Sequence, residues 1–441
     1  MKCTFFGTDG VRARVGSTPF NRLQLSQFAQ ALAQWARAKY GTRARILIAQ
    51  DTRTSCDWIN TTVSSALLLH NIQVYNARVL PTPAVGALLH YTDQFDCGII
   101  ISASHNPHTD NGIKIVDAKN GKLTTADEHE IEQLFNQNIQ MPINYLHLGT
   151  HHQFIDAEQQ YRTLVQRHFK TNFLNGITMI LDCAHGATCA TAPTLFKSFG
   201  ATVITINNKP NGSNINHDCG ALHPKQLAEQ VRKHNAHIGF AFDGDGDRVV
   251  AVNKDSIIKN GDDILALLST HPLYERQKII VGTIMSNQGF ASFLEQNNKT
   301  LIRTPVGDKY VSTALKQHNA LLGGEQSGHI IMRDYLPTGD GMVTALRIAE
   351  TMIINNNWSF ETFIRFPQIL INVPVGYKHN LETEPFSQLI AQHKRHLENG
   401  RLVVRYSGTE SVLRVMVEDV NAKHAQDVGS ALAHILQKEL S

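Results

Sequence analysis

Residues 238–252 read Ile238-Gly239-Phe240-Ala241-Phe242-Asp243-Gly244-Asp245-Gly246-Asp247-Arg248-Val249-Val250-Ala251-Val252. Two apolar runs of strand length flank an acidic turn, in which aspartates occupy positions 243, 245 and 247. Alternate residues of an extended chain lie about 6–7 Å apart, so the three charges repel one another unless a cation sits between them. Hard oxygen ligands of this kind suit magnesium, manganese or calcium. The segment therefore predicts a strand–turn–strand unit with a metal site in its turn.

The calcium loop of an EF-hand also opens with alternating aspartates. It requires glycine at its sixth position and glutamate at its twelfth. Counted from Asp243, those positions hold Arg248 and Lys254, so this kind of site is excluded. The alternative that stays open is an acidic, glycine-rich turn without a ligand. Flexible glycines between carboxylates let the turn fold around an ion, which favours the metal site.

The composition is that of a globular chain with several cores. A length of 441 residues suggests two to four domains. Hydrophobic residues make up 42% and charged residues 18%, values typical of soluble proteins. The net charge is only +3 and there is no Lys/Arg-rich run, so nucleic-acid binding has little support. A small excess of cations suits small anionic substrates.

The cysteines and the apolar runs indicate the compartment. The six cysteines form no C-x-x-C pair, which argues against a zinc site or a disulfide scaffold and for a reducing environment. Residues 1–9 lack the apolar core of a signal peptide, and no run approaches the 18 apolar residues of a membrane span. We therefore expect a cytoplasmic protein. The histidines are scattered, and His151-His152 is expected in a loop.

Three segments of the chain follow one plan, in which an apolar run, a turn, a helical stretch and a second apolar run succeed one another. This order is the signature of a βαβ unit. The apolar runs lie at 46–48 and 72–75, at 179–181 and 203–206, and at 279–281 and 300–302, around helical stretches near 57–70, 189–199 and 287–297. Each unit continues into a strand, a polar loop, a return strand and a closing helix near 125–137, 262–270 or 340–354. We predict three related α/β domains with mixed sheets, each presenting one polar loop from the same place.

The chain from about residue 366 differs and predicts a smaller C-terminal α+β domain with its own polar loop. Strands are expected at 369–373, 402–404 and 413–417, and helices near 386–399 and 422–438. The predicted domains span residues 1–145, 146–253, 254–365 and 366–441, and each contains one of the four polar loops. Four domains with one loop each predict a central cleft.

The first polar loop, residues 102–107, offers Ser104. Serine is a poor nucleophile unless it is activated, and no G-x-S-x-G elbow is present to support acyl hydrolysis. A serine near a divalent cation suits phosphoryl transfer, in which catalysis is mostly positioning and charge neutralisation. His105 or Lys114 could handle the proton. The alternative is a polar turn with no chemistry.

The third and fourth loops offer groups for a phosphorylated sugar. Glu325, Ser327 and His329 can hydrogen-bond sugar hydroxyls, although Gly-Gly followed by polar residues is often only a turn. Two guanidiniums, hydroxyls and a backbone amide are the groups of a typical anion site. Arginine can bind a phosphate there through two hydrogen bonds. The groups of this fourth loop belong to Arg405, Ser407, Gly408, Thr409 and Arg414. The alternative here is a surface turn with solvated arginines.

These loops resemble the signature loops of the α-D-phosphohexomutase family. The matching motifs appear in the family's order over essentially the whole chain, at 6–12, 102–107, 243–248, 325–329 and 405–410. The sequence Gly-Glu-Gln-Ser-Gly-His at 324–329, with Gln326, resembles the family members that act on glucosamine phosphates. The stretches 214–220 and 281–287 resemble the same subgroup.

The resemblance implies roles for individual residues. Ser104 would carry a phosphoryl group, which with the three aspartates would hold one magnesium ion. Lys114 would be the general acid or base, with Arg12 and Arg248 near the transferred group. Glu325 and Ser327 would contact the sugar. The phosphate that is not transferred would be held by Arg405, Ser407, Gly408 and Thr409.

The implied activity interconverts glucosamine 6-phosphate and glucosamine 1-phosphate through a 1,6-bisphosphate that turns end for end, feeding UDP-N-acetylglucosamine and cell-wall precursor synthesis. Such turning predicts a mobile fourth domain. The implied partner is a hexosamine phosphate, without nucleic acid or membrane, and a homodimer is allowed. The alternatives are the same chemistry on mannose or glucose phosphates, a phosphatase with an aspartate nucleophile, and a non-catalytic sugar-phosphate sensor.

Four residues depart from the family pattern and leave loop rigidity and affinity open. Tyr406 and Ser411 stand where proline is common, Ala13 where glycine is usual, and Lys309 where the subgroup has arginine.

Overall fold

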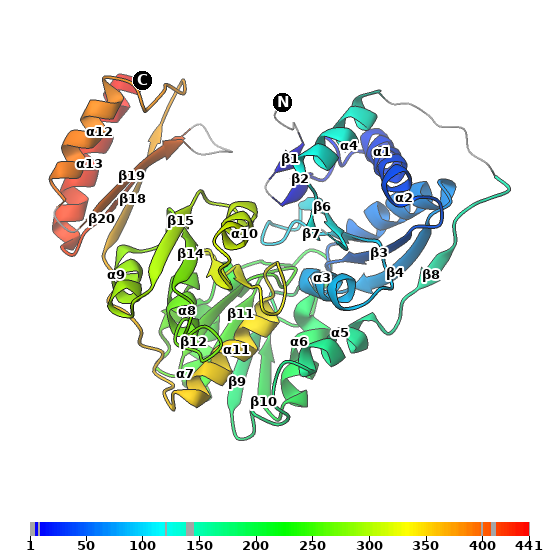
Figure 1. The fold of residues 1–441 in the computed structure, drawn as a ribbon, viewed down its shortest axis with the longest axis horizontal. Coiled ribbons are helices and arrows are strands. Elements are labelled where there is room, and N and C mark those ends of the chain that lie inside the picture. Colours follow the sequence, from blue (N-terminus) through cyan, green and yellow to red (C-terminus); the bar gives the residue numbers. More distant parts are fainter. Residues whose placement is uncertain are drawn as a thin grey trace. The chain divides into compact units, whose positions relative to one another are not determined.

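The computed structural model describes residues 5–7, 9–119, 121–137, 145–397, 400–406 and 412–440 (Figure 1). The chain divides into two compact units. The first comprises Met1–Thr283 and Thr304–Phe360, and the second comprises Ile284–Arg303 and Glu361–Ser441. The three predicted α/β segments supply the first unit, except that residues 284–303 and 361–365 belong to the second. The four domain boundaries stay a prediction.

The first sheet of the first unit is mixed, with the order β1-β2-β6-β5-β3-β4-β8 and with β7 paired to β6. Strands β4, β3 and β5 run parallel, whereas β6 returns antiparallel to β5. The strands are β1 (Phe6–Gly7), β2 (Gly10–Arg14), β3 (Arg45–Gln50), β4 (Gln73–Val79), β5 (Cys97–Ile101), β6 (Asp110–Asp117), β7 (Gly121–Lys122) and β8 (His151–Gln153). The prediction of a loop at His151-His152 is wrong, because β8 pairs with β4.

Helices cover both faces of this sheet, which is why β5 is buried at every position. Its Cys97, Ile99 and Ile101 join a core with residues of α1, α2 and α4. A Cβ at Gly98, on the other face, would meet Val85 and Leu89 of α3. The helices are α1 (Arg22–Tyr40), α2 (Cys56–Leu69), α3 (Thr82–Tyr91) and α4 (Thr125–Gln137).

The second sheet has the order β10-β9-β11-β12-β13. Strands β10, β9 and β11 are parallel, and β12 returns antiparallel to β11 with Phe242 opposite Val249. Its strands are β9 (Thr178–Asp182), β10 (Thr202–Ile206), β11 (Ile238–Phe242), β12 (Val249–Asn253) and β13 (Ile258–Lys259). The helices of this region are α5 (Ala157–Gln166), α6 (Thr188–Ser198), η1 (Gly220–Leu222), α7 (Lys225–Lys233) and α8 (Gly261–Leu268).

The third region repeats the plan. Strand β14 (Ile279–Thr283) is parallel to β16 (Leu322–Gly324), and β17 (Ile330–Met332) returns antiparallel to β16. Helix α10 (Asp308–Gln317) precedes β16 and α11 (Gly341–Ile354) follows β17. In all three regions a polar loop joins a buried strand to its antiparallel return strand, as predicted. The related α/β domains with mixed sheets are confirmed.

The repeat also contains a second helix in each region, which was not predicted from the sequence. Helices α3, α7 and α10 each lie directly before the strand that leads into the polar loop. The N-terminus of α3 places Thr82 in the site described below, and that of α10 places Asp308 there. Because α3 and α10 were not predicted, Thr82 and Asp308 were not predicted as site residues either.

The second unit holds an antiparallel sheet with the order β18-β20-β19, formed by β18 (Gln368–Pro374), β19 (Arg401–Tyr406) and β20 (Val412–Glu418). Helix α13 (Ala422–Leu440) packs on it and contributes Leu432 and Leu436 to an apolar core. Helices α9 (Gln288–Gln296) and α12 (Phe386–Arg395) belong to the same unit, and β15 (Thr300–Thr304) ends at its boundary. The predicted C-terminal α+β domain is confirmed.

Among the described residues, no helix combines the length and apolarity needed to span a bilayer.

Candidate active site

The serine loop and the aspartate loop meet in the interior of the first unit. Ser104 is fully buried, and its Oγ donates a hydrogen bond of 2.6 Å to Asp243 Oδ2. The Arg248 amide donates to the other oxygen of Asp243 at 3.1 Å. The fold thus brings two loops that are 139 residues apart in sequence into direct contact. The predicted pairing of the serine with the aspartates is present in the geometry.

The aspartate turn has a second support that sequence reasoning missed. Thr82, at the start of α3, donates from Oγ1 to Asp245 Oδ2 at 2.6 Å and from its amide to the Asp245 carbonyl at 2.9 Å. Pro81 and Pro83 around it mark a helix start, since proline is tolerated in the first turn of a helix. That signal could have located α3, although not its contact with the aspartate.

Lys114 supplies the positive charge next to the turn. Its Nζ lies 2.8 Å from Asp245 Oδ2, 2.9 Å from Asp247 Oδ2 and 2.8 Å from Asp9 Oδ2. Burial opposes the charged amine, but these three carboxylates together raise the pKa of Lys114 well above its ordinary value. The side chain comes from β6, the return strand of the serine loop, and joins that strand to the aspartate turn.

The carboxylates of the turn differ in their electrostatics. Burial, together with the charges of Asp247 and Asp245, raises the pKa of Asp243 well above its ordinary value. Burial acts in the same direction on Asp247, but Lys114, His329 and Arg248 outweigh it and hold the pKa of Asp247 well below its usual range. Carboxylates packed together in the interior acquire different pKa values in this way, because they cannot all be charged at equal cost.

The donor set of the turn fits a hard divalent cation. Asp243, Asp245 and Asp247 each offer an oxygen within 4.8 Å of the others, and all three are buried. Oδ1 of Asp245 and Oδ1 of Asp247 are buried without a hydrogen-bond partner among the described residues. Buried carboxylate oxygens need a cation or a donor. The observed arrangement therefore suits the predicted metal site.

His105, next to the serine, lies 3.3 Å from Ser104 Oγ through its Nδ1. Burial and the neighbouring Arg248 and Arg12 lower the pKa of His105 to about 4. The imidazole is therefore neutral near pH 7, where it is a weak base and does not act as an imidazolium donor.

Arg12 and Arg248, both predicted near the transferred group, contact different carboxylates. Arg12 pairs with Asp9 at 2.9 Å, and Arg248 Nε lies 3.8 Å from Asp247 Oδ1. Burial disfavours the Arg248 charge, but Asp247 and the other acidic groups raise the pKa of Arg248 above its ordinary value.

A chain of acids and bases beyond these residues was not predicted. Lys122 contacts Asp9 Oδ1 at 2.7 Å and also binds Asp308 at the start of α10. His329 continues the chain, because its Nδ1 lies 3.6 Å from Asp247 and its Nε2 lies 3.8 Å from Asp308. Single acidic or basic residues far apart in sequence carry no local sign that they will pair. Only the folded arrangement identifies them.

The third polar loop is held at the ends of β16 and β17. Glu325 Oε1 accepts a hydrogen bond of 2.8 Å from the Gly307 amide, which fixes the carboxylate at the N-terminus of α10. Gln326 Nε2 lies 3.4 Å from Asp262 Oδ2. Ser327 is half-buried. Of the three predicted sugar-binding residues, the structure brings His329 directly to the aspartate turn.

The predicted phosphate site lies in the second unit. Arg405 of β19 and Arg414 of β20 are direct cross-strand partners. Burial and the Arg414 charge lower the pKa of Arg405. Like charges directly opposite one another destabilise a sheet, and a phosphate bound by both guanidiniums would offset this repulsion. The predicted Ser407, Gly408 and Thr409 lie outside the described residues, as does Ser411.

The other departures from the family pattern have visible partners. The Tyr406 hydroxyl accepts a hydrogen bond of 2.9 Å from the His379 amide, so the tyrosine ties its strand end to a neighbouring loop. Lys309 pairs with Glu128 at 3.2 Å. Ala13 lies opposite Asn111 between β2 and β6.

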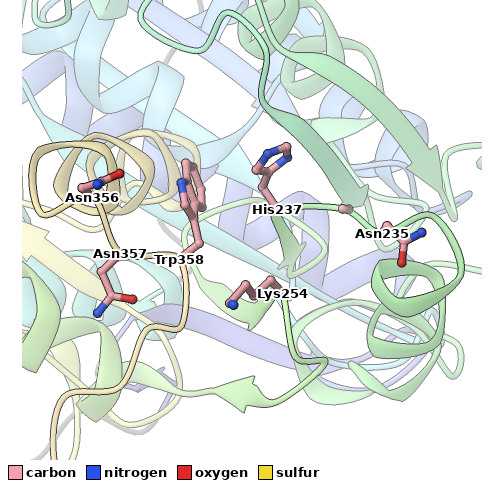
Figure 2. Close-up of a pocket in the computed structure, with 7 residues that line it drawn as sticks. Asn235, His237, Lys254, Asn356, Asn357 and Trp358 are labelled. Atoms are coloured by element: carbon pink, nitrogen blue, oxygen red, sulfur yellow. The ribbon is translucent and has the colours of Figure 1, made fainter.

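A separate hollow of about 390 Å³ contains none of these site residues. Figure 2 shows Trp358 and His237 side by side in it, with ring centroids 5.4 Å apart and Lys254 nearby. Its lining consists of Asn235, Ala236, His237, Lys254, Asn356, Asn357 and Trp358.

Family models match the chain in order. The models for phosphoglucomutase/phosphomannomutase alpha/beta/alpha domains I, II and III match residues 4–141, 153–256 and 260–366, and the model for the C-terminal domain matches residues 370–435.

Full-length relatives carry a more specific name. Proteins named phosphoglucosamine mutase from Aliarcobacter butzleri and Nitratidesulfovibrio vulgaris are 38% and 37% identical, with 99% of each chain covered. One from Campylobacter concisus is 39% identical over 94% of this chain and 95% of its own.

Solved structures share the fold. A phosphoglucomutase/phosphomannomutase family protein from Burkholderia thailandensis has a TM-score of 0.81 at 19% identity, covering 98% of both chains. Aspergillus fumigatus N-acetylphosphoglucosamine mutase, solved in complex with GlcNAc-6P and magnesium, has a TM-score of 0.68 at 16% identity, covering 100% of this chain and 96% of its own.

Proposed function

The chain belongs to the phosphoglucomutase/phosphomannomutase family, the α-D-phosphohexomutases, and on this premise we propose that it interconverts glucosamine 6-phosphate and glucosamine 1-phosphate. The observation that carries the proposed chemistry is the contact of Ser104 Oγ with Asp243 inside a buried cluster of carboxylates. The glucosamine substrate is supported by the name of the full-length relatives and by Gln326 in the third loop.

The reaction begins with a phosphoryl group on Ser104. The C1 hydroxyl oxygen of glucosamine 6-phosphate attacks phosphorus, the bond from phosphorus to Ser104 Oγ breaks, and the hydroxyl proton leaves. Ser104 Oγ then holds a proton, and the product in the site is the 1,6-bisphosphate. After the bisphosphate turns end for end, Ser104 Oγ attacks the phosphorus at C6 and loses its proton. The bond from that phosphorus to the C6 oxygen breaks, the C6 oxygen takes up a proton, and glucosamine 1-phosphate leaves with Ser104 phosphorylated again.

The chain's own residues orient and neutralise this exchange. Lys114, held by three carboxylates, is assigned to proton transfer with the serine oxygen, and Arg12 and Arg248 to the charge of the moving group. Asp243, Asp245, Asp247 and the phosphorylated Ser104 would hold one Mg²⁺, which when bound neutralises charge on the phosphoryl oxygens. The related Aspergillus enzyme was solved with magnesium, which supports that assignment.

The remaining groups bind the sugar phosphate. Glu325, Ser327 and His329 are assigned to the sugar, and Arg405 and Arg414 to the phosphate that is not being transferred, together with Ser407, Gly408 and Thr409. The substrate must be accepted in both orientations. For that reason the sugar and phosphate groups belong to loops separate from the one that carries Ser104.

Substrate comparison tests the proposed specificity. We expect kcat/KM for glucosamine 6-phosphate to exceed the values for mannose and glucose phosphates measured with the same preparation. A higher kcat/KM for mannose or glucose phosphate would assign the chain to that substrate instead. Binding without turnover of any of the three, with no phosphate on Ser104, would identify a non-catalytic sensor.

A further inference from the structure

An ion pair that has no assigned role lies beneath the serine loop. Arg53 Nε contacts Asp51 Oδ2 at 2.9 Å, and both side chains are completely excluded from solvent. They follow β3 directly, in the segment Asp51-Thr52-Arg53-Thr54. A buried ion pair stabilises a fold only when further hydrogen bonds satisfy its remaining donors and acceptors. The partners of this pair therefore indicate what it holds.

The other N–H groups of the Arg53 guanidinium donate hydrogen bonds to carbonyls in one short stretch of backbone. Nη2 donates to the Ser104 carbonyl at 3.0 Å and to the Asn106 carbonyl at 2.8 Å. Nη1 donates to the Asp110 carbonyl at 3.0 Å and also to the Pro107 carbonyl. One side chain thus fixes four carbonyls between Ser104 and the start of β6. Only the planar, many-donor geometry of arginine allows this.

The carboxylate of Asp51 holds the same loop from its amide side. Ser102 Oγ donates to Asp51 Oδ2 at 2.6 Å, and the Ser104 amide donates to Ser102 Oγ at 2.8 Å. The backbone of Ser104 is therefore bound on both sides, at its carbonyl by Arg53 and at its amide through Ser102.

The backbone of Ser104 needs such support because its φ is +53°, in the left-handed region that residues with a Cβ rarely adopt. Strained backbone at a functional loop persists only when surrounding contacts determine it. The conformation sets the direction of Oγ toward Asp243.

The same segment connects the serine loop with the surroundings of the aspartate turn. Thr52 Oγ1 donates to the His185 carbonyl at 2.6 Å, and the Thr54 amide donates to the Gly212 carbonyl at 3.0 Å. From that side, Asn216 Nδ2 donates to the Ser104 carbonyl at 2.9 Å and to the Asn106 carbonyl at 3.1 Å. The Ser104 carbonyl thereby receives donors from both sides of the junction.

We propose that Asp51 and Arg53 are positioning residues that hold the Ser104 loop in its left-handed conformation against the aspartate turn, with Asn216 as a second, weaker grip. The proposal rests on the proposed function for its catalytic consequence, because it assumes that Ser104 is the phosphoryl carrier. We call Asp51 and Arg53, with Ser102 and Asn216, the clamp. Loss of the clamp changes the direction of Ser104 Oγ without removing any group that touches the substrate.

The test compares full-length variants Arg53→Ala, Arg53→Lys, Ser102→Ala and Asn216→Ala with the parent chain. Hydrogen exchange of the peptide spanning residues 102–110 reports the loop, and steady-state kinetics report kcat and KM separately. The control Arg22→Lys changes an exposed arginine on α1. Ser65→Ala, at an exposed serine, is the control for Ser102→Ala.

We expect faster exchange in the 102–110 peptide for all four clamp variants. Arg53→Ala should lower kcat about 100-fold with KM nearly unchanged, since misplacing a reacting group by about 1 Å has effects of that size. Arg53→Lys should lose less, and Ser102→Ala and Asn216→Ala about 10-fold or less. Free guanidinium ion should restore part of the kcat of Arg53→Ala. The controls should match the parent chain.

Two results overturn the clamp. One is unchanged exchange of the 102–110 peptide in Arg53→Ala and Ser102→Ala. The other is faster exchange with an unchanged kcat, which leaves the proposed function intact while removing the catalytic consequence. Failure of the proposed function has a different signature, in which Ser104→Ala turns over normally. Hydrogen exchange of the 102–110 peptide still tests the clamp in that case, because hydrogen exchange does not depend on turnover.

Discussion

The centre around Ser104 and the pair Arg405–Arg414 are built by opposite means. At the centre, like charges are buried and each is offset by a charged neighbour, as Lys114 shows with its three carboxylates. At the arginine pair, two cations face each other across adjacent strands of the small sheet. The first arrangement is largely balanced by cationic side chains of the protein and leaves oxygens of Asp245 and Asp247 for a divalent cation, whereas the second presents two guanidiniums that suit a phosphate.

This difference separates two tasks. A preorganised, buried centre stabilises charge that moves during a reaction, and it needs no rearrangement at that moment. A pair of arginines that binds the phosphate not being transferred contributes binding in the ground state and the transition state alike. Changes at the centre should therefore act on kcat, and changes at the arginines should act on KM.

The largest effect is expected from Ser104→Ala, which removes the phosphoryl carrier. We expect kcat to fall by at least about 1,000-fold, since losing a covalent carrier removes the reaction path itself. The measurement is mutase turnover with glucosamine 6-phosphate, and Ser65→Ala, at an exposed serine, is the control. Near-normal turnover of Ser104→Ala would contradict the assigned centre.

Removal of divalent cations should come next. Chelation should lower turnover by at least about 100-fold, because the charge on the phosphoryl oxygens would then be poorly neutralised. Added Mg²⁺ should restore turnover and raise the melting temperature. Asp245→Asn should weaken this rise in melting temperature. Full activity after exhaustive chelation would contradict the assignment of a metal to the aspartate turn.

Lys114→Met tests the electrostatic balance of the centre. Loss of the ammonium leaves Asp9, Asp245 and Asp247 without their shared partner, and we expect kcat to fall about 100-fold. The control is Lys170→Met, at an exposed lysine. If KM rises while kcat is unchanged, Lys114 binds substrate and does not take part in the transfer.

Asp340 offers a pH test of the support behind the aspartate turn. It caps α11, whose Gly341 amide bonds the Gly246 carbonyl of that turn. Burial outweighs the hydrogen bonds from Val343 and Tyr161 and raises the pKa of Asp340 from 3.8 to about 6. The folded state then binds a proton more tightly than the unfolded state. The stabilisation that comes from protonated Asp340 is complete below the pKa of Asp340 in the unfolded state. It is lost as the pH rises through the pKa of Asp340 in the folded state.

Asp340→Asn keeps the capping acceptor and removes this titration. We expect the variant to match the parent chain near pH 4 and to exceed its unfolding free energy by about 2 kcal/mol at pH 7. Denaturant unfolding at both pH values measures this, with Asp93→Asn as the control for loss of a carboxyl elsewhere on the chain. An equal difference at both pH values would show that titration of Asp340 is not its cause.

Arg405→Ala should have the smallest effect. It removes a charged hydrogen-bond donor from the phosphate site, so we expect KM to rise about 10-fold with kcat little changed. Arg414→Ala should behave alike, and Arg395→Ala, at an exposed arginine of α12, is the control. A fall in kcat as large as that of Lys114→Met would erase the distinction between the two regions.

The sequence predicted those parts of the fold that have a local signal. Continuous apolar runs such as Ile238–Phe242 located the buried strands, and the polar stretches after them located the loops with Ser104 and the aspartates. Helix α3 was missed because it is buried along almost its whole length and therefore lacks a polar face that would show helical periodicity, although Pro81 and Pro83 are typical of a helix start. Helix α10 has a local signal that was not used, since Val311, Ala314 and Leu315 recur at helical spacing.

The partners within the site were beyond sequence reasoning for a different reason. Asp9, Lys122 and Asp308 are ordinary charged residues that meet only through tertiary contacts. Arg53 has a local signal only in hindsight, in its proximity to Asp51. Which carbonyls it holds depends on where the loop 102–110 lies, and no spacing in the chain states that.

The central claim is that Ser104 carries the group that is transferred. Peptide mass spectrometry of the purified protein, before and after a single turnover with glucosamine 6-phosphate, tests it most directly. We predict one phosphoryl group on Ser104 before mixing. Samples quenched during the turnover should show its transfer to the sugar as glucosamine 1,6-bisphosphate, and it should be back on Ser104 once glucosamine 1-phosphate is released. A phosphoryl group on Asp243, Asp245 or Asp247, or turnover by a chain that never carries phosphate on Ser104, would contradict the account.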